Sequence, residues 1–106
     1  SARSPTAVFV ASDTMALGAL SELGRRGVRV PGDVSVAGFD DIPALEFIHP
    51  RLTTVHVRMA ELGAAGVARL LRLLDGDDRG LLTRVHPVAL VVRESTARPR
   101  ALHRPR

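Results

Sequence analysis

Several residue types are missing from this 106-residue chain, and each absence excludes a class of chemistry. There is no cysteine, so the chain has no disulfide, no thiolate nucleophile and no Cys-ligated zinc. Phe9, Phe39 and Phe47 are the only aromatic residues, too few for a platform on which single-stranded nucleic acid stacks. No apolar run approaches the roughly 20 residues of a membrane span, so we expect no membrane partner.

Lysine, asparagine and glutamine are also absent, a bias that we attribute to a GC-rich genome. The remaining composition, 45% hydrophobic and 25% charged, is that of an ordinary globular domain. The formal net charge of +4 has a location, because residues 1–97 carry 11 Arg against 11 acidic residues. The excess therefore lies in the Arg/Pro tail at residues 98–106, which we expect to be disordered. Any DNA binding by that tail would lack sequence specificity and fall steeply with salt.

Hydrophobic patterning predicts four strands. Two short apolar runs, residues 6–11 and 34–39, are typical of buried strands in a parallel sheet. Residues 52–57 alternate and predict an extended segment. A last strand over residues 85–92 contains Pro87, which favours an edge position.

Two helices are predicted at residues 13–26 and 60–74, where apolar side chains recur at helical spacing. Residues 43–48 predict a short irregular or helical stretch, and Pro31-Gly32 predicts a type II turn. The order is strand, helix, strand, loop, strand, helix, strand, with connections long enough for right-handed crossovers. The sequence therefore predicts an α/β fold with a parallel sheet flanked by helices.

No catalytic pattern is present. The sequence has no nucleophile elbow, no Walker loop and no glycine-rich dinucleotide fingerprint. Its four histidines are scattered, with no pair at ligand spacing on one helix, so we expect no metal site and no cofactor. We therefore do not expect this protein to be an enzyme. The weak alternative is an enzyme that uses Asp13 and Asp40 as a carboxylate pair.

Polar residues follow the first two predicted strands. In a parallel sheet, ligands gather beyond the carboxyl ends of the strands. If the two strands are neighbours, Ser12-Asp13 and Asp40-Asp41 face one crevice. Ser12, Asp13 and Asp41 also suit simple capping or turn roles. Phe39 suits a pocket wall and a core position equally well.

Four motifs, in order and correctly spaced, carry a resemblance to a known family: SDTMALG, VPGDVSVAGFDD, PRLTTV and LVVRES. Over residues 5–99 the chain resembles the C-terminal part of lactose/galactose repressor (LacI/GalR) family proteins. That family implies cytoplasmic transcription regulators with an N-terminal helix-turn-helix domain, a hinge helix and a two-lobed effector domain. The effector domain has the periplasmic-binding-protein-like (type I) fold, and its effector, commonly a sugar or a purine, lies between the lobes.

The resemblance implies a division of the chain. Residues 1–97 would be a C-terminal fragment of the effector domain, with a disordered tail at 98–106. Within the fragment, residues 1–51 would belong to the C-terminal lobe, residues 52–87 to the crossover and helix of the N-terminal lobe, and residues 88–97 to the return strand. The surface that should bury the helix at 60–74 is missing from this chain.

The resemblance also implies site residues. Asp40, the first acid of GFDD, matches the aspartate that contacts the effector, and Asp13 matches another acid of the same cleft. Ser12 stands where many members have an Asn that contacts effector, and its shorter hydroxyl departs from that pattern. Candidates for the dimer interface are four apolar residues, although Leu17 also suits the core: Leu17, Leu45, Phe47 and Ile48.

The leading hypothesis is thus the effector-binding and dimerisation region of a LacI/GalR-type transcription regulator. Its partners would be a sugar-like small molecule and a second subunit, with operator DNA bound only through the missing N-terminal domain. The alternative is a fragment of a periplasmic sugar-binding protein of the same fold. A plain interaction module that only dimerises is a third.

Overall fold

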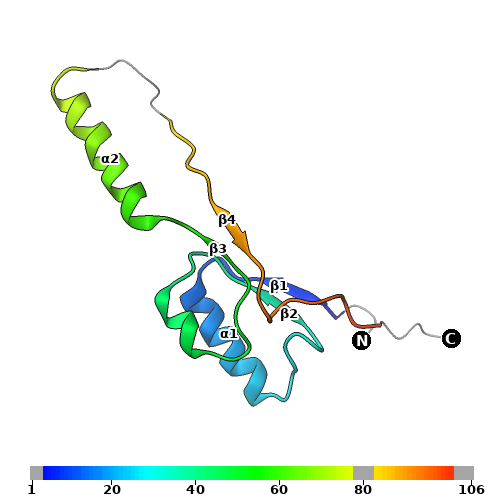
Figure 1. Cartoon of the computed structure of the whole chain (residues 1–106). Helices are drawn as coiled ribbons and strands as arrows, with labels where there is room; N and C mark the ends of the chain where they lie inside the picture. Colours follow the sequence, from blue (N-terminus) through cyan, green and yellow to red (C-terminus); the bar gives the residue numbers. More distant parts are fainter. Residues whose placement is uncertain (1–3, 78–82, 102–106) are drawn as a thin grey trace.

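The computed structural model describes residues 4–77 and 83–101. Strands and helices alternate along the chain, with one 3-10 helix, η1, in the middle (Figure 1). The elements are β1 (Ala7–Phe9), α1 (Asp13–Arg25), β2 (Ser35–Ala37), η1 (Pro43–Phe47), β3 (Thr54–His56), α2 (Met59–Leu74) and β4 (Ala89–Val91).

Two small sheets form the framework. β1 and β2 pair in parallel, with Val8 opposite Val36, while β3 and β4 pair antiparallel, with Val55 opposite Leu90. Single parallel bridges, including one between Ala37 and Thr53, connect the end of β2 to the segment of β3. The predicted α/β class with a parallel strand pair and helices is confirmed.

Local sequence explains where α1 begins and ends. Ser12 has extended backbone geometry, and its Oγ accepts a hydrogen bond from the Met15 N–H at 3.2 Å, which makes it the N-cap. Gly27 has a φ of +75°, the left-handed conformation that commonly ends helices. The helix ends one residue earlier than predicted, within the ordinary fraying of helix termini.

The core is small and lies between α1, β2, η1 and the chain entering β3. Its members are Ala16, Val36, Leu45 and Leu52. Around them pack partly buried apolar side chains from α1 and the loops: Val10, Leu17, Leu20, Leu23, Val30, Ile42 and Ile48. All the buried apolar side chains of the described residues lie before position 53.

The segment after β4 returns to this core and fastens β2 to β3. Ser95 is fully buried, and its carbonyl accepts a hydrogen bond from the Val36 N–H at 2.9 Å. Its hydroxyl donates to the Val36 carbonyl, while its oxygen accepts from the Thr53 N–H at 2.8 Å. A single serine thus satisfies backbone groups on two neighbouring segments, which explains why a polar side chain is tolerated there.

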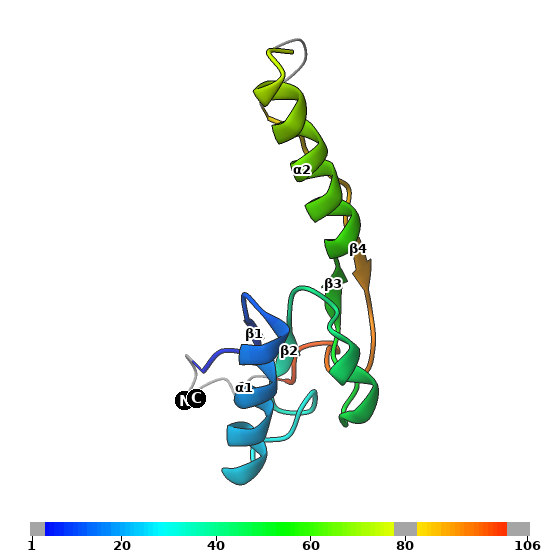
Figure 2. The ribbon, with the colours of Figure 1, turned by 90° about the vertical axis from the view of Figure 1, so that its left-hand side faces the viewer.

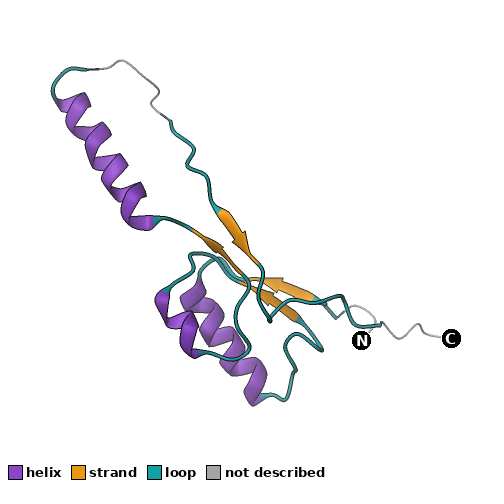
Figure 3. Ribbon diagram, in the orientation of Figure 1, coloured by secondary structure: helices purple, strands orange, loops and turns teal. Residues whose placement is uncertain are grey.

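α2 stands away from the rest of the molecule as an arm (Figures 1 and 2). No residue of α2 is buried, and the described chain measures 68 × 33 × 19 Å along its principal axes. Figure 3 shows the two strands of the β3–β4 ribbon leading from the compact part towards that arm. The apolar stripe predicted on this helix therefore has no cover among the described residues.

Three predictions about the elements were wrong. The second strand–helix–strand unit is no parallel crossover, because β3 and β4 are antiparallel. Gly32 lacks the positive φ that a type II turn requires, and the Val30–Pro31 peptide is cis. β1 was predicted to be buried but is exposed, since burial of both strand faces needs a layer on each side.

The start of the tail that we expected to be disordered contacts the rest of the chain. The Arg100 guanidinium donates hydrogen bonds to the carbonyl oxygens of Pro5, at 3.1 Å, and Asp33. These contacts hold the start of the tail beside the N-terminal segment. The last five positions of that prediction, 102–106, lie outside the described residues.

Candidate functional site

The ends of β1 and β2 meet, as the crevice hypothesis requires. Beyond β1, the Val10 N–H donates to the Ala37 carbonyl at 2.8 Å, and the Asp13 N–H donates to the Phe39 carbonyl at 2.9 Å. The N-terminus of α1 therefore lies directly beside the loop that carries Asp40 and Asp41.

Asp13 occupies the centre of this junction and is fully buried. Its Oδ1 accepts a hydrogen bond from the Thr54 hydroxyl at 2.7 Å. Its Oδ2 accepts from the backbone N–H groups of Asp41, at 2.5 Å, and Ile42, at 3.0 Å. Three donors within the protein thus hydrogen-bond to the Asp13 carboxylate, which we expected either to contact the ligand or to serve as a cap. The structure gives Asp13 the role of fixing the loop after β2.

Gly38 makes this arrangement sterically feasible. A Cβ atom at this position would lie 2.9 Å from the Leu52 Cδ2 and would run into the Asp13 carboxylate. Contacts of that length essentially never occur at real Cβ atoms. Glycine is therefore required here because the buried carboxylate passes over the backbone.

The loop that follows Gly38 contains two residues with a strained backbone. Asp40 and Asp41 both have positive φ, at +124° and +64°, which non-glycine residues rarely adopt. Such a conformation costs roughly 1–3 kcal/mol at each residue and persists where the surroundings hold it. Here the Asp40 N–H donates to the Val55 carbonyl at 3.0 Å, and the Asp40 carbonyl accepts from the Val57 N–H at 3.4 Å.

The two acidic side chains of this loop differ in their partners. The partly exposed Asp40 carboxylate makes no hydrogen bond or ion pair with any of the residues that the structure describes. The Asp41 carboxylate, in contrast, is mostly buried and fully paired: its Oδ1 lies 2.8 Å from the Arg93 Nη2, and its Oδ2 lies 2.8 Å from the His56 Nδ1. Asp40 is thus the acid that is available to accept from another molecule.

The pairing keeps Asp41 ionised. Burial by itself would raise the pKa of the Asp41 carboxyl, but the hydrogen bonds from Arg93 and His56 outweigh burial and lower that pKa below its ordinary value. Arg93 is itself anchored, because its Nη1 donates to the Leu52 carbonyl at 3.1 Å. Sequence reasoning missed His56 and Arg93, which are distant from Asp41 in sequence and belong to no local motif.

The other predicted ligand contacts keep part of their freedom. The Ser12 oxygen caps α1, which leaves its O–H able to donate to another acceptor. Phe39 is partly buried beside Asp40, so its ring is neither a core residue nor a fully open surface. The structure therefore brings Ser12, Phe39 and Asp40 to one edge of the sheet.

The predicted dimer contacts divide into two groups. Leu45 is 4% exposed and belongs to the core, so little of its side chain is available for contact with a second subunit. Leu17 and Ile48 pack against the core while remaining partly exposed. Phe47 is 87% exposed at the end of η1, a position where an aromatic ring has no partner in the described part of the chain.

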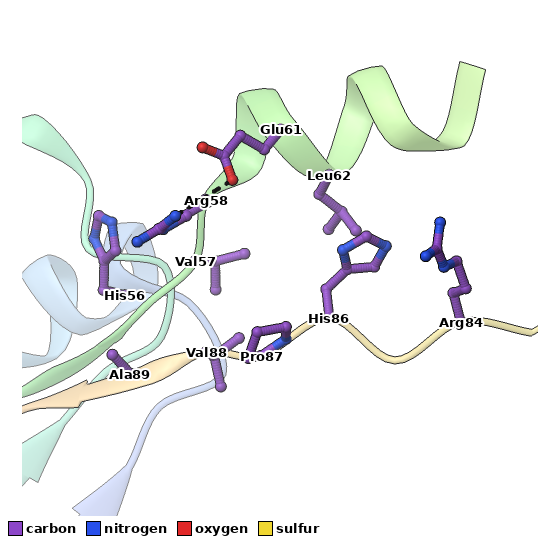
Figure 4. A pocket seen from close by; sticks show the side chains of 10 residues that line it. All are labelled: His56, Val57, Arg58, Glu61, Leu62, Arg84, His86, Pro87, Val88 and Ala89. Carbon is purple, nitrogen blue, oxygen red and sulfur yellow. Dashed lines mark ion pairs between the residues drawn. The ribbon is translucent and has the colours of Figure 1, made fainter. Parts of the chain in front are cut away.

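A separate hollow of about 430 Å³ lies between α2 and the segment before β4. Figure 4 shows Arg58 and Glu61 on the helix side, joined by an ion pair of 3.6 Å, and Arg84 and His86 on the opposite side. Within residues 4–77 and 83–101, no group of three His, Cys, Asp or Glu is positioned to hold a metal ion. No described helix is long and apolar enough to cross a membrane.

Comparison with known proteins identifies relatives of this chain. Residues 1–96 match the model of the periplasmic binding protein-like domain family. The HTH-type transcriptional repressor PurR of Pasteurella multocida is 45% identical over 92 residues, which are 86% of this chain and 27% of that repressor. The HTH-type transcriptional repressor CytR of Escherichia coli K12 is 44% identical over 92 residues, 87% of this chain and 27% of that repressor.

Solved structures that resemble this chain include a Lac repressor and a LacI family regulator. A Lac repressor dimer bound to operator and the anti-inducer ONPF superposes with a TM-score of 0.77 at 42% identity, covering 87% of this chain and 32% of that one. A LacI family regulator from Enterococcus faecium with bound ribose gives a TM-score of 0.76 at 34% identity, covering 87% and 34%.

The chain spans only about 27% of the length of the curated relatives that it matches. Those relatives are transcriptional repressors and not enzymes. The match nevertheless covers nearly all of this chain and includes the strands, the first helix and the loop that carries Asp40. The chain therefore belongs to the periplasmic binding protein-like domain family, and the proteins that it resembles include HTH-type transcriptional repressors and a LacI family regulator.

Proposed function

We propose that this chain is the C-terminal part of the effector-binding domain of a cytoplasmic LacI-type transcription regulator, with Asp40 as its main effector contact. The observation that carries the proposal is the unpaired Asp40 carboxylate on a strained loop. A carboxylate is an acceptor-only group, so it suits the hydroxyl groups of a sugar or the N–H groups of a base.

The surroundings of Asp40 support a binding role. Strained non-glycine backbone clusters at ligand sites. Here the buried Asp13 carboxylate, the Arg93–Asp41 ion pair and the His56–Asp41 hydrogen bond hold the loop in place. Ser12 adds a hydroxyl donor and Phe39 adds an apolar ring at the same sheet edge. A related LacI family regulator was solved with bound ribose, which makes a sugar the first class of effector to test.

The proposal extends to the whole regulator. Operator binding would belong to a helix-turn-helix domain outside this chain, as the names of the related HTH-type repressors suggest. The exposed Phe47, with the partly exposed Leu17 and Ile48, would contribute to contact with a second subunit, since a Lac repressor relative was solved as a dimer. The proposal also includes the division of the chain into a C-terminal lobe (residues 1–51), a crossover and helix of the N-terminal lobe (52–87), a return strand (88–97) and a tail (98–106).

The test replaces Asp40 by alanine in the regulator that contains this chain. A thermal-shift screen of pentoses, hexoses and purine bases first identifies a ligand, and calorimetry then measures its affinity. We expect Asp40→Ala to weaken binding by about 1–3 kcal/mol, because a ligand donor loses its partner in the site. The matched control is Asp75→Ala, which removes an exposed acid beyond the end of α2. Equal affinities of the two variants would contradict the proposal.

A further inference from the structure

The paired acid beside Asp40 is held by an arginine and a histidine from different parts of the chain. His56 is the last residue of β3, and its Nδ1 lies 2.8 Å from the Asp41 Oδ2. Arg93 follows β4, and its Nη2 lies 2.8 Å from the Asp41 Oδ1. Both carboxylate oxygens are therefore engaged, one by a permanent cation and one by a side chain that gains and loses charge.

The backbone links the same histidine to Asp40. The Asp40 N–H donates to Val55 and the Asp40 carbonyl accepts from Val57, so these two hydrogen bonds bracket His56 on β3. A shift of His56 relative to Asp41 would thus act on both ends of the Asp40 residue. Because Asp40 and Asp41 have positive φ, their conformation depends on such contacts.

We propose that His56 is a positioning residue that makes the hold on the Asp40 loop, and with it effector binding, stronger when its imidazole is protonated. In the neutral state the Nδ1–H donates a hydrogen bond to Asp41, because the ionised carboxylate only accepts. Protonation adds a positive charge to the donor, so the hydrogen bond becomes an ion pair as well and is stronger. The link to effector binding rests on the proposed function of Asp40.

Solvent can reach the imidazole, which allows it to exchange its proton. The His56 side chain is 45% exposed and borders the hollow shown in Figure 4. The charged and titratable groups around it come from every neighbouring element: Asp40, the bridge partner of His56, and Asp41 after β2, Arg58 and Glu61 at the start of α2, Arg84 and His86 before β4, and Arg93 after β4. Of these, Asp41 makes the direct contact, so it determines the sign of the effect.

The primary experiment needs no ligand. Amide hydrogen exchange of the 106-residue chain is measured between pH 5.5 and 8 and expressed as protection factors, which remove the chemical pH dependence of exchange. The reporting amides are those of Asp40 and Val57, which make the two bracketing hydrogen bonds. The reference amide is that of Val10, which donates to Ala37 in the β1–β2 region away from His56.

We expect protection of the reporting amides, relative to Val10, to fall about two- to fivefold as the pH rises, the scale of a partly exposed ion pair. In His56→Gln the ratio should be low and independent of pH. In His56→Lys, which keeps a positive charge throughout this range, it should be high and independent of pH. A purely structural role of His56 would not be restored by lysine.

Two results would overturn the inference: a ratio that does not change with pH in the unaltered chain, or a pH dependence that survives in His56→Gln. A titration of the unaltered chain followed by NMR avoids any folding defect of the variants. There, the Asp41 amide and the His56 imidazole should shift with the same midpoint, and separate midpoints would count against the inference. Because neither measurement involves an effector, loss of the pH effect is distinguishable from failure of the Asp40→Ala test.

Discussion

Three carboxylates lie within one loop junction, and their surroundings give them three different roles. Asp13 is buried among three hydrogen-bond donors and holds the loop. Asp41 is mostly buried between Arg93 and His56 and links the loop to β3 and to the segment after β4. The Asp40 carboxylate has no partner within the described residues, so its oxygens are able to accept hydrogen bonds from another molecule.

The role of Asp13 leads to a stability prediction. Asp13→Ala leaves the Thr54 hydroxyl and the backbone N–H groups of Asp41 and Ile42 without their acceptor. Each unsatisfied buried donor costs about 1–3 kcal/mol, so we expect the free energy of unfolding to fall by at least about 3 kcal/mol in urea titrations. The control Thr14→Ala, an exposed change next in sequence, should stay within about 0.5 kcal/mol. Comparable effects of both changes would refute the buried role.

A second prediction compares two glycines. Gly38→Ala places a Cβ against the Asp13 carboxylate and 2.9 Å from Leu52, so we expect a loss of about 1–3 kcal/mol from overpacking. Gly18→Ala, on α1 with open space around its Cβ, should instead raise stability by about 0.5–1 kcal/mol through helix propensity. Thermal unfolding of both variants checks this, and a Gly38 variant as stable as the unaltered chain would show that Asp13 is not where the structure has it.

The sequence predicted which segments meet at this sheet edge but not which side chains pair there. The rule about carboxyl ends of parallel strands brought Ser12, Asp13, Asp40 and Asp41 to one edge, and backbone contacts join those segments. The partners that decide the roles lie far along the chain: Thr54 is 41 residues from Asp13, and Arg93 is 52 residues from Asp41. No local pattern identifies pairs of that separation.

At the scale of elements, α1 and α2 contrast in what they bury. Both show apolar residues at helical spacing, and both were predicted nearly to their ends. α1 buries Ala16 against β2 and η1, whereas α2 buries nothing. Periodicity thus predicts that a helix forms with an apolar side, but it does not identify the surface that buries that side.

This contrast predicts different costs for the same substitution. Leu70 on α2 is exposed, so Leu70→Ala should change the free energy of unfolding of this chain by less than about 0.5 kcal/mol. Leu52 is fully buried in the core, so Leu52→Ala should cost about 2–5 kcal/mol. Chemical denaturation of the two variants makes the comparison. A large cost at Leu70 would mean that α2 packs against something in this chain.

At the scale of the whole molecule, the apolar surface is divided unevenly. The compact part keeps a small core, while the arm presents exposed apolar side chains on α2 and on the segment that returns through β4: Met59, Leu62, Val67, Leu70, Leu71, Leu73, Leu74, Val85, Val88, Leu90 and Val92. A large exposed apolar surface is rare on soluble monomers and marks a contact surface. The matched relatives are about three times as long as this chain, so their remaining residues are available to cover this surface.

We therefore expect the isolated 106-residue chain to self-associate through the arm. A Leu side chain removed from water contributes roughly 1.5–3 kcal/mol, so a charge at Leu70 should weaken association about tenfold or more. Sedimentation across a concentration series would compare Leu70→Glu with Ala68→Glu. Both positions are exposed on α2 and both changes add one negative charge, but Ala68 lies on the opposite side of the helix from Leu70. If only Leu70→Glu restores a monomer, the apolar side of α2 is the contact surface; a monodisperse unaltered chain, or equal effects of the two variants, would refute this.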